Sequence, residues 1–492
     1  MGVIAKQSIK GSVYTYAGAL TGFINTGLLM PEFFAPEQIG LVNLLIAFTL
    51  IFSQLGNLGF SGVITRLFPY FRNNEKKHNG ILTLGLLISV AGFLLTLLLF
   101  FISEKYLVKS NYKTSELLSD NIFYVPVLTF FMILFYLFDN YNKVLFDAVS
   151  GIFLREFFVR LADLFIIILY IFDYIDFKTF VFWYIVIFAL PSVILMFILI
   201  KRKVFYLTGI NKNLLLKLKK EIIGISLFWI LSGFAGIAVQ SIDKYMTNYY
   251  LGLAASGIYA VTFYFGMLVI MPARSLRKIS SVIIAEAWKK NDIKTISEIY
   301  EKSSVNLFIA GSLVVIGLWV NIDNIFEIIP EYAAGKYVVL FISLLSLADM
   351  SSGTAAAIIG NSGYYKINAY VMFFTLLSII ITNYFFINLW GLKGAAFASF
   401  ISVSFAVFFR FLFLYKKYKL QPYSLRHVKI LFTGLLTLFV NFLIPEIDNV
   451  FADIVVRSFA VSVVFASLIY FFKVSEDVNS FVLKIIDKLK SS

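Results

Sequence analysis

Stretches of about 20 apolar residues recur from one end of the chain to the other, separated by short polar segments. Each stretch is long enough to cross about 30 Å of hydrocarbon as an α-helix. The apolar positions are continuous within a stretch and do not alternate with the period of two that a membrane barrel requires. The pattern therefore predicts an all-α polytopic membrane protein.

Fourteen transmembrane helices are expected, in a six plus six plus two arrangement. The first six lie near residues 11–30, 39–63, 80–102, 121–147, 152–172 and 179–200. The next six lie near 222–250, 256–284, 305–329, 336–359, 367–388 and 394–415, and the last two near 428–445 and 451–472. The charged tail, residues 473–492, is expected to form a short amphipathic helix on the membrane surface.

Lysine and arginine are distributed unevenly between alternate loops. If the N-terminus is cytoplasmic, the loops on that side carry 32 of the 42 Lys and Arg, the opposite loops carry six, and four lie within predicted helices. Cytoplasmic loops of membrane proteins carry such an excess of positive charge. Adding or removing one helix would invert half of this bias, so we expect an even number of spans and both termini in the cytoplasm.

A basic connector, residues 201–221, lies between the sixth and seventh helices and carries seven Lys or Arg. Small residues recur at matching positions on its two sides: Gly18 and Gly22 with Ser232 and Gly236, and Gly40 with Gly257. Because each half has an even number of spans, the repeat would be parallel, with a pseudo-twofold axis along the membrane normal. The expected domains are an N-lobe (1–200), the cytoplasmic connector (201–221), a C-lobe (222–420), two appended helices (421–472) and a cytoplasmic tail (473–492).

Composition excludes several kinds of site. Hydrophobic residues make up 60% of the 492 residues and charged residues only 14%, which is too little charge for the surface of a soluble protein of this size. The net charge of +14 is explained by the positive loops and by contact with anionic lipids, so no nucleic-acid partner is expected. The chain has no cysteine, and its two histidines lie in basic loops, so we expect no metal site and no cofactor.

Charged residues within the predicted helices are the candidate functional residues, because burying a charge in a membrane is costly. On helix four, Asp139, Lys143 and Asp147 are spaced as one stripe, and Glu156, Arg160 and Asp163 form a similar stripe on helix five. The two stripes form either an ion-pair ladder between the helices or one wall of a water-filled cavity. The candidates for a central cavity are Arg160, Lys244, Arg274, Lys143, Asp163, Asp243, Asp349, Asp139, Arg66 and Arg410.

Some of these candidates have a second interpretation. Arg66 and Arg410 lie near the cytoplasmic ends of helices two and twelve, where a long cationic side chain reaches the interface without any functional role. Arg274 follows Pro272, which is expected to kink helix eight. Asp349 is placed near the middle of helix ten. The chain has no phosphate-binding glycine loop, no HExxH and no GxSxG, so it is not expected to be an enzyme.

Three segments resemble one family of transporters. They are LGNLGFSGVITRLFPYFRNN at Leu55–Asn74, SIDKYMTNYYLGLAASGIYAVTF at Ser241–Phe263 and WGLKGAAFASFIS at Trp390–Ser402. They are similar to segments of the bacterial polysaccharide flippases of the O-antigen and teichoic-acid (Wzx-like) type, which belong to the multidrug/oligosaccharidyl-lipid/polysaccharide exporter superfamily. The resemblance extends over the whole chain in helix number and arrangement. It implies two six-helix lobes around a central cavity, and alternating access between the two faces of a bacterial cytoplasmic (inner) membrane.

The resemblance also implies a substrate, a polyprenyl-diphosphate-linked oligosaccharide used in surface polysaccharide biosynthesis. Burying its polar groups in hydrocarbon would cost several kcal/mol each, so a hydrated cavity is required. Arg160, Lys244 and Arg274 are the candidates for binding the diphosphate. Further implied partners are membrane lipids, a coupling H⁺ or Na⁺, and a polysaccharide polymerase or glycosyltransferases.

Two other functions stay open. An ion-coupled multidrug or organic-cation exporter of the same superfamily would normally have a carboxylate in its first helix; this chain has none there, and Asp163 or Asp349 would have to substitute. A membrane-bound glycan polymerase or acyltransferase would need a large outer loop or a catalytic histidine, and both are missing.

Overall fold

The computed structural model describes residues 3–108, 115–445 and 447–480, and in these residues it consists of helices joined by turns and short loops, without strands. Twelve helices of this described part are long and apolar enough to cross a membrane. The expected first and fifth helices are also helical, but a π-helical turn divides each of them. The prediction of an all-α polytopic membrane protein is confirmed. Residues 481–492 of the expected tail lie outside the described residues.

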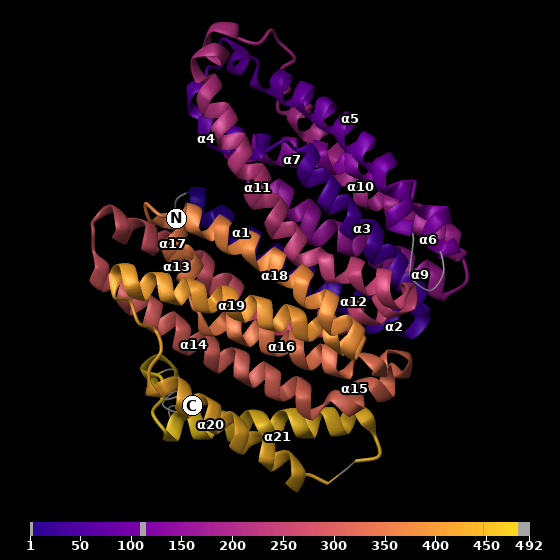
Figure 1. Cartoon of the computed structure of the whole chain (residues 1–492), viewed down its shortest axis with the longest axis vertical. Coiled ribbons are helices and arrows are strands. Elements are labelled where there is room, and N and C mark those ends of the chain that lie inside the picture. Colours follow the sequence, from indigo (N-terminus) through magenta and orange to yellow (C-terminus); the bar gives the residue numbers. More distant parts are fainter. Residues whose placement is uncertain (1–2, 109–114, 446, 481–492) are drawn as a thin grey trace. The chain divides into compact units, whose positions relative to one another are not determined.

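The helices form two compact units, Met1–Ala260 and Val261–Ser492 (Figure 1). The first unit contains the following elements: α1 (Val3–Phe23), η1 (Ile24–Leu29), α2 (Met30–Phe33), α3 (Pro36–Gly56), α4 (Phe60–Phe71), η2 (Lys77–Gly80), α5 (Ile81–Val108), α6 (Glu116–Asn121), α7 (Tyr124–Val144), α8 (Val149–Ile152), η3 (Phe153–Phe158), α9 (Val159–Ile171), α10 (Phe177–Lys201) and α11 (Lys212–Leu251). Helix α7 is central to this unit, where it packs against α3, α4, α5 and α10.

The second unit begins within α12 (Leu253–Met267). It continues with η4 (Leu268–Ile270), α13 (Met271–Lys289), α14 (Ile293–Val320), α15 (Ile322–Ile328), η5 (Pro330–Gly335), α16 (Lys336–Ser351), α17 (Ala355–Asn361), α18 (Lys366–Trp390), α19 (Leu392–Tyr418), α20 (Leu425–Val440), η6 (Asn441–Leu443) and α21 (Val450–Phe471). Helices α14, α16 and α19 pack in sequence, and α18 lies along α19 (Figure 1). The appended pair α20 and α21 packs on α14 through a cluster that includes Ile316, Ile430 and Val461.

The expected second helix is broken within the segment LGNLGFSG. Helix α3 ends at Gly56 and α4 begins at Phe60, because Leu58 and Gly59 adopt positive φ angles of 49° and 70°. A side chain at Gly59 would place its Cβ 2.3 Å from the carbonyl oxygen of Ser226, so glycine also permits close contact with α11.

The basic connector is only partly a loop. Its residues after Lys203 run without helix to Asn211, whose side chain accepts a hydrogen bond from Leu214 N (3.1 Å) and caps α11. The second half of the expected connector, 212–221, therefore belongs to the 40-residue helix α11. At about 1.5 Å per residue this helix is about 60 Å long, roughly twice the hydrocarbon thickness, so its basic first part extends beyond the membrane.

Gly40 and Gly257, which the repeat pairs with each other, are in contact. A Cβ on Gly40 would lie 2.4 Å from the carbonyl oxygen of Leu253, and a Cβ on Gly257 would lie 1.8 Å from that of Pro36. Each glycine thus packs on the chain segment that precedes the other. Such a reciprocal contact is the geometry that a twofold relation produces.

The interruption expected at Pro272 is present, since the 3₁₀ turn η4 separates α12 from α13 and Pro272 lies in the first turn of α13. Asp349 is not near the middle of a helix: α16 ends at Ser351, and a bend through Gly353 leads into α17. The sequence did not reveal this break, because the segments on both sides of it, α16 and α17, are apolar and rich in small residues.

Candidate functional site

The π turns of helices one and five, η1 and η3, lie in the same part of the first unit, where α1 packs along η3. A Cβ on Gly18 would lie only 1.8 Å from the carbonyl oxygen of Glu156, so the two backbones are in contact. The buried side chain of Asn25 in η1 donates a hydrogen bond to the carbonyl oxygen of Arg160 (2.7 Å). Because π turns inside helices occur frequently at functional sites, this is a candidate functional region.

Charged groups of helix five surround these turns. The Arg160 guanidinium pairs with Glu156 at 3.3 Å, with both side chains about one-third exposed. Asp163 lies within electrostatic range of Arg155 and Arg160, and its Oδ1 is enclosed without a hydrogen-bond partner among the described residues. The geometry provides two cations and one enclosed carboxylate oxygen in the same small region.

Arg155 in η3 is a member of this cluster that the sequence analysis missed. Its guanidinium lies 4.0 Å from the ring centroid of Phe188, a cation–π contact, and it is within electrostatic range of Tyr184. Arg155 lies inside the expected fifth helix, within the apolar run IFLREFFVRLADLF, and this position is the signal that marks it as a further candidate.

The charged stripe of helix four pairs differently from the expected ladder. Lys143 pairs with Asp139 of its own helix, and Asp139 packs on Gly151. Asp147 lies beyond the end of α7 and pairs with Arg202 at 3.2 Å. In the described part of the chain no ion pair joins helix four to helix five, so the ladder interpretation is wrong.

The pair Asp243 and Lys244 joins α11 to its neighbours. Buried Asp243 accepts a hydrogen bond from the Tyr259 hydroxyl (2.8 Å), which links α11 to α12. Lys244 Nζ lies 3.5 Å from Asn43 Oδ1 of α3. As expected for adjacent residues on a helix, the two side chains contact different elements.

In the second unit, Asp349 and Arg410 lie near an arginine that was not among the candidates. Arg277 donates to Asp349 Oδ2 (2.6 Å), to the Asp349 carbonyl (2.7 Å) and to the Gly353 carbonyl (3.0 Å). It thereby satisfies carbonyl groups at the break after α16. Arg410 is buried within electrostatic range of Asp349 and Arg277. Burial raises the pKa of the nearby Tyr423 hydroxyl, which is 3.5 Å from Ser351 Oγ.

The last two candidates are exposed. Arg274 lies on the exposed side of α13 without an ion pair or side-chain hydrogen bond to the described residues, and Arg66 lies on the exposed side of α4. Within the first unit, Arg160 and Asp163 belong to the region of the π turns. Within the second unit, Asp349 and Arg410 lie together.

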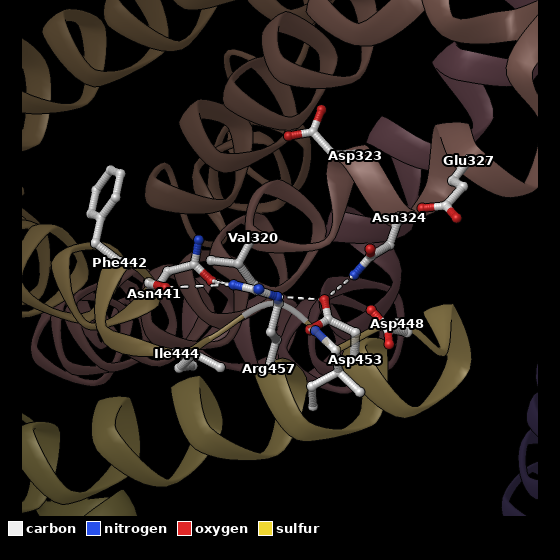
Figure 2. A pocket seen from close by; sticks show the side chains of 11 residues that line it. Val320, Asp323, Asn324, Glu327, Asn441, Phe442, Ile444, Asp448, Asp453 and Arg457 are labelled. Atoms are coloured by element: carbon white, nitrogen blue, oxygen red, sulfur yellow. Dashed lines mark hydrogen bonds and ion pairs between the residues drawn. The ribbon is translucent and has the colours of Figure 1, made fainter.

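A polar cavity of about 660 Å³ lies in the second unit between the ends of α14 and α21 (Figure 2). Its lining includes Asp323, Glu327 and Asp448, with the buried pair Asp453 and Arg457 at one side. Neither Asp453 nor Arg457 was among the sequence-based candidates, although their spacing by four residues within an apolar helix is a detectable signal.

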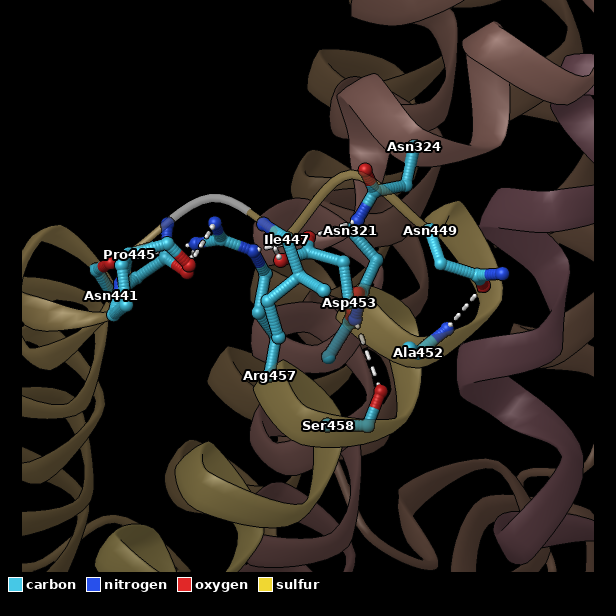
Figure 3. A network of polar contacts seen from close by, with 11 residues as sticks. Asn321, Asn324, Asn441, Pro445, Ile447, Asn449, Ala452, Asp453, Arg457 and Ser458 are labelled. Atoms are coloured by element: carbon cyan, nitrogen blue, oxygen red, sulfur yellow. Dashed lines mark hydrogen bonds and ion pairs between the residues drawn. The ribbon is translucent and has the colours of Figure 1, made fainter.

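The pair holds the loop before α21 in place (Figure 3). Arg457 Nε donates to Asp453 Oδ2 at 2.5 Å, and Arg457 Nη1 donates to Asn441 Oδ1 at 2.8 Å. Asn324 Nδ2 donates to the same Asp453 oxygen at 2.6 Å, which joins α15 to α21. Nearly all polar side-chain atoms of Asp453 and Arg457 form hydrogen bonds to other groups of the protein, so we assign the pair a structural role.

Nearly the whole chain has the fold of known membrane transporters. It is similar to a lipid II flippase, MurJ, in an inward closed conformation, with a TM-score of 0.75 over 94% of this chain and 98% of that chain at 15% identity. It is also similar to an inward-facing multidrug resistance MATE family transporter of the MOP superfamily, with a TM-score of 0.62 over 91% of this chain and 100% of that chain at 14% identity. The MATE multidrug transporter DinF-BH gives a TM-score of 0.56 over 84% of this chain and 95% of that chain at 14% identity.

These identities are low, and the likeness shows the fold. No family model and no curated protein matches the sequence. The three solved structures are named as a lipid flippase and two multidrug transporters.

Proposed function

We propose that the chain is a flippase that moves a lipid-linked oligosaccharide across a bacterial cytoplasmic membrane by alternating access. The observation that carries this proposal is the similarity of nearly the whole chain to a lipid II flippase, with a higher TM-score than to the two multidrug transporters. The three resembling segments support it independently. The loop charges favour an orientation with both termini in the cytoplasm.

The substrate's chemistry explains why such a protein needs cations in its path. A polyprenyl-diphosphate-linked sugar carries a diphosphate whose transfer into hydrocarbon is prohibitive without compensating charges. Arg274 is exposed, and Arg160 is paired at 3.3 Å with a partly exposed glutamate, so both guanidinium groups are accessible to an anion. Lys244 contributes a third cation, on α11 beside α3. These are the residues we assign to diphosphate binding.

The experiment deletes the gene and measures lipid-linked glycans on each face of the membrane. We expect the glycan to accumulate on the cytoplasmic side and surface polysaccharide to be lost. Normal surface polysaccharide together with raised drug sensitivity would overturn the proposal. Complementation then uses Arg160→Ala, Lys244→Ala and Arg274→Ala, with Lys178→Ala, an exposed residue in the first turn of α10, as the matched control. Full transport by all three variants at normal protein levels would remove them as ligand groups.

A second function, ion-coupled export of drugs or organic cations, is favoured by one observation. Asp163 is a carboxylate in the first unit with an enclosed oxygen that has no hydrogen-bond partner in the described part of the chain, which is the kind of group that binds H⁺ or Na⁺. Asp163→Asn separates the two functions. It should abolish drug resistance if the chain is an exporter, and it should leave glycan flipping partly active if the carboxylate only balances nearby arginines.

A further inference from the structure

A groove lies between the first half of α18 and the second half of α19 in the second unit. It has a volume of about 630 Å³ and is lined by Ile367, Tyr370, Val371, Phe374, Thr375, Ser378, Ser402, Phe405, Ala406, Phe409 and Phe413. One end of the groove lies at Ser378 and Ser402, whose hydroxyl groups are 2.9 Å apart and tie the two helices together. From there the groove extends to Ile367 and Phe413, toward the lysine-bearing ends of the two helices.

The groove has the length of one membrane leaflet. Between Ile367 and Ser378 helix α18 rises about 17 Å, which is about half of the roughly 30 Å hydrocarbon core. Four aromatic side chains on its walls are more than half exposed: Tyr370 (57%), Phe374 (63%), Phe405 (54%) and Phe409 (55%). An apolar slot of this length, open along its side, fits a single hydrocarbon chain that enters from the lipid.

Positive charge lies at one end of the groove only. Lys366 begins α18, and Lys416 and Lys417 lie in the last turn of α19; all three are exposed. Lys417 Nζ is 4.9 Å from the ring centroid of Tyr364, which packs on Phe413 of the groove with ring centroids 5.7 Å apart. The charged end and the apolar slot are therefore continuous.

The surrounding sequence contains no carboxylate to neutralise these lysines. Between Asp349 and Glu446 there is no Asp or Glu, whereas Lys and Arg occur eight times. Both helices of the groove thus carry only positive charge. A ligand that complements this surface has an anionic head at the lysines and an apolar chain that ends near mid-membrane.

We propose that this groove is a binding site for an anionic phospholipid. One acyl chain lies between α18 and α19, and the phosphate contacts Lys366 and Lys417. The loop charges assign the lysine-bearing end to the cytoplasmic side, so the lipid comes from the cytoplasmic leaflet. The proposal is independent of whether the chain transports glycans or drugs.

The experiment compares binding of phosphatidylglycerol and phosphatidylcholine to the purified full-length protein in detergent, by native mass spectrometry. Wild type should retain phosphatidylglycerol preferentially. Lys366→Glu with Lys417→Glu should lower the ratio of bound phosphatidylglycerol to phosphatidylcholine by about fivefold or more for each reversed charge. Lys393→Glu is the matched control, because Lys393 lies at the other end of α19, 5.8 Å from the ring of Tyr337; it should leave the ratio unchanged.

A second variant tests the slot itself. Val371→Trp fills the groove without removing charge and should lower binding of both lipids, with the protein still monodisperse. The proposal is overturned if wild type does not distinguish the two lipids, if the double reversal keeps the preference, or if Val371→Trp binds both lipids normally. Binding of a polyprenyl phosphate with no binding of phosphatidylglycerol would also overturn it.

Discussion

At the scale of single residues, the structure separates charges with a structural role from charges accessible to a ligand. Asp453 and Arg457 are 3% and 8% exposed and share four protein hydrogen bonds at 3.3 Å or less. Arg277 similarly uses its guanidinium on Asp349 and on backbone carbonyls. By contrast, the side chain of Arg274, three residues before Arg277 on the same helix, is exposed. Burial and partners, rather than position in the sequence, distinguish the two groups.

Removing one partner of the buried pair should be strongly destabilising. Arg457→Ala leaves the Asp453 carboxylate buried without its cation, and we expect a loss of about 3–5 kcal/mol. Thermal unfolding of the detergent-solubilised protein, followed by size-exclusion chromatography, measures the shift. Lys336→Ala is the control, because Lys336 pairs with Asp323, whose side chain is 83% exposed, and such a pair contributes only about 0–1 kcal/mol. Equal unfolding temperatures for the two variants would contradict the assignment.

Arg277 and Arg274 should differ in the same way. Arg277→Lys keeps the charge but replaces a planar group that donates three hydrogen bonds by a single ammonium, so it should lower thermal stability. Arg274→Lys should leave stability unchanged, since Arg274 has no such partners in the described part of the chain. If Arg277→Lys unfolds at the wild-type temperature, its bonds to the break after α16 contribute little.

At the scale of elements, the sequence predicted where helices lie better than where they break. Apolar runs are long signals, so all the expected spans correspond to helical segments. The break at Leu58–Gly59 and the π turns η1 and η3 depend on tertiary contacts, such as that of Gly59 with α11. The ion pair of Glu156 with Arg160 could be predicted from its spacing of four residues on one helix. The pair of Arg277 with Asp349 could not be predicted, because these residues are 72 positions apart and only the tertiary fold brings them together.

The contact between α1 and η3 should depend on Gly18. Gly18→Ala places a methyl group 1.8 Å from the Glu156 carbonyl oxygen, so the helices must separate, at a cost of about 1–3 kcal/mol. Gly236→Ala is the matched control: nothing lies within 4 Å of its added Cβ, and alanine favours the helix by up to about 1 kcal/mol. Unfolding temperatures should move in opposite directions. An unchanged unfolding temperature for Gly18→Ala would show that α1 and η3 do not need this close packing.

At the scale of the whole molecule, residues 201–221 lie within the first unit, and hydrogen bonds tie their first half to the rest of that unit. The Tyr141 hydroxyl donates to the Val204 carbonyl (3.2 Å), Thr208 N donates to Thr83 Oγ1 (3.0 Å), and Asn211 N donates to the Asn79 carbonyl (3.3 Å). The expected role of residues 201–221, to connect the N-lobe to the C-lobe on the cytoplasmic side, stays a prediction.

The loop charges predict which segments face the cytoplasm. This prediction can be tested without background labelling, because the chain contains no cysteine. Exposed residues are replaced singly: Lys76→Cys and Lys290→Cys in segments assigned to the cytoplasm, Tyr174→Cys and Phe442→Cys in segments assigned to the outside. A membrane-impermeant maleimide added to intact spheroplasts should label only the last two, and permeabilisation should expose all four. If the Lys76 and Tyr174 variants follow the expectation while the Lys290 and Phe442 variants are reversed, the number of spans between Lys76 and Lys290 is odd, whereas six are expected. That result would exclude a parallel repeat, since two six-helix halves must begin on the same side of the membrane.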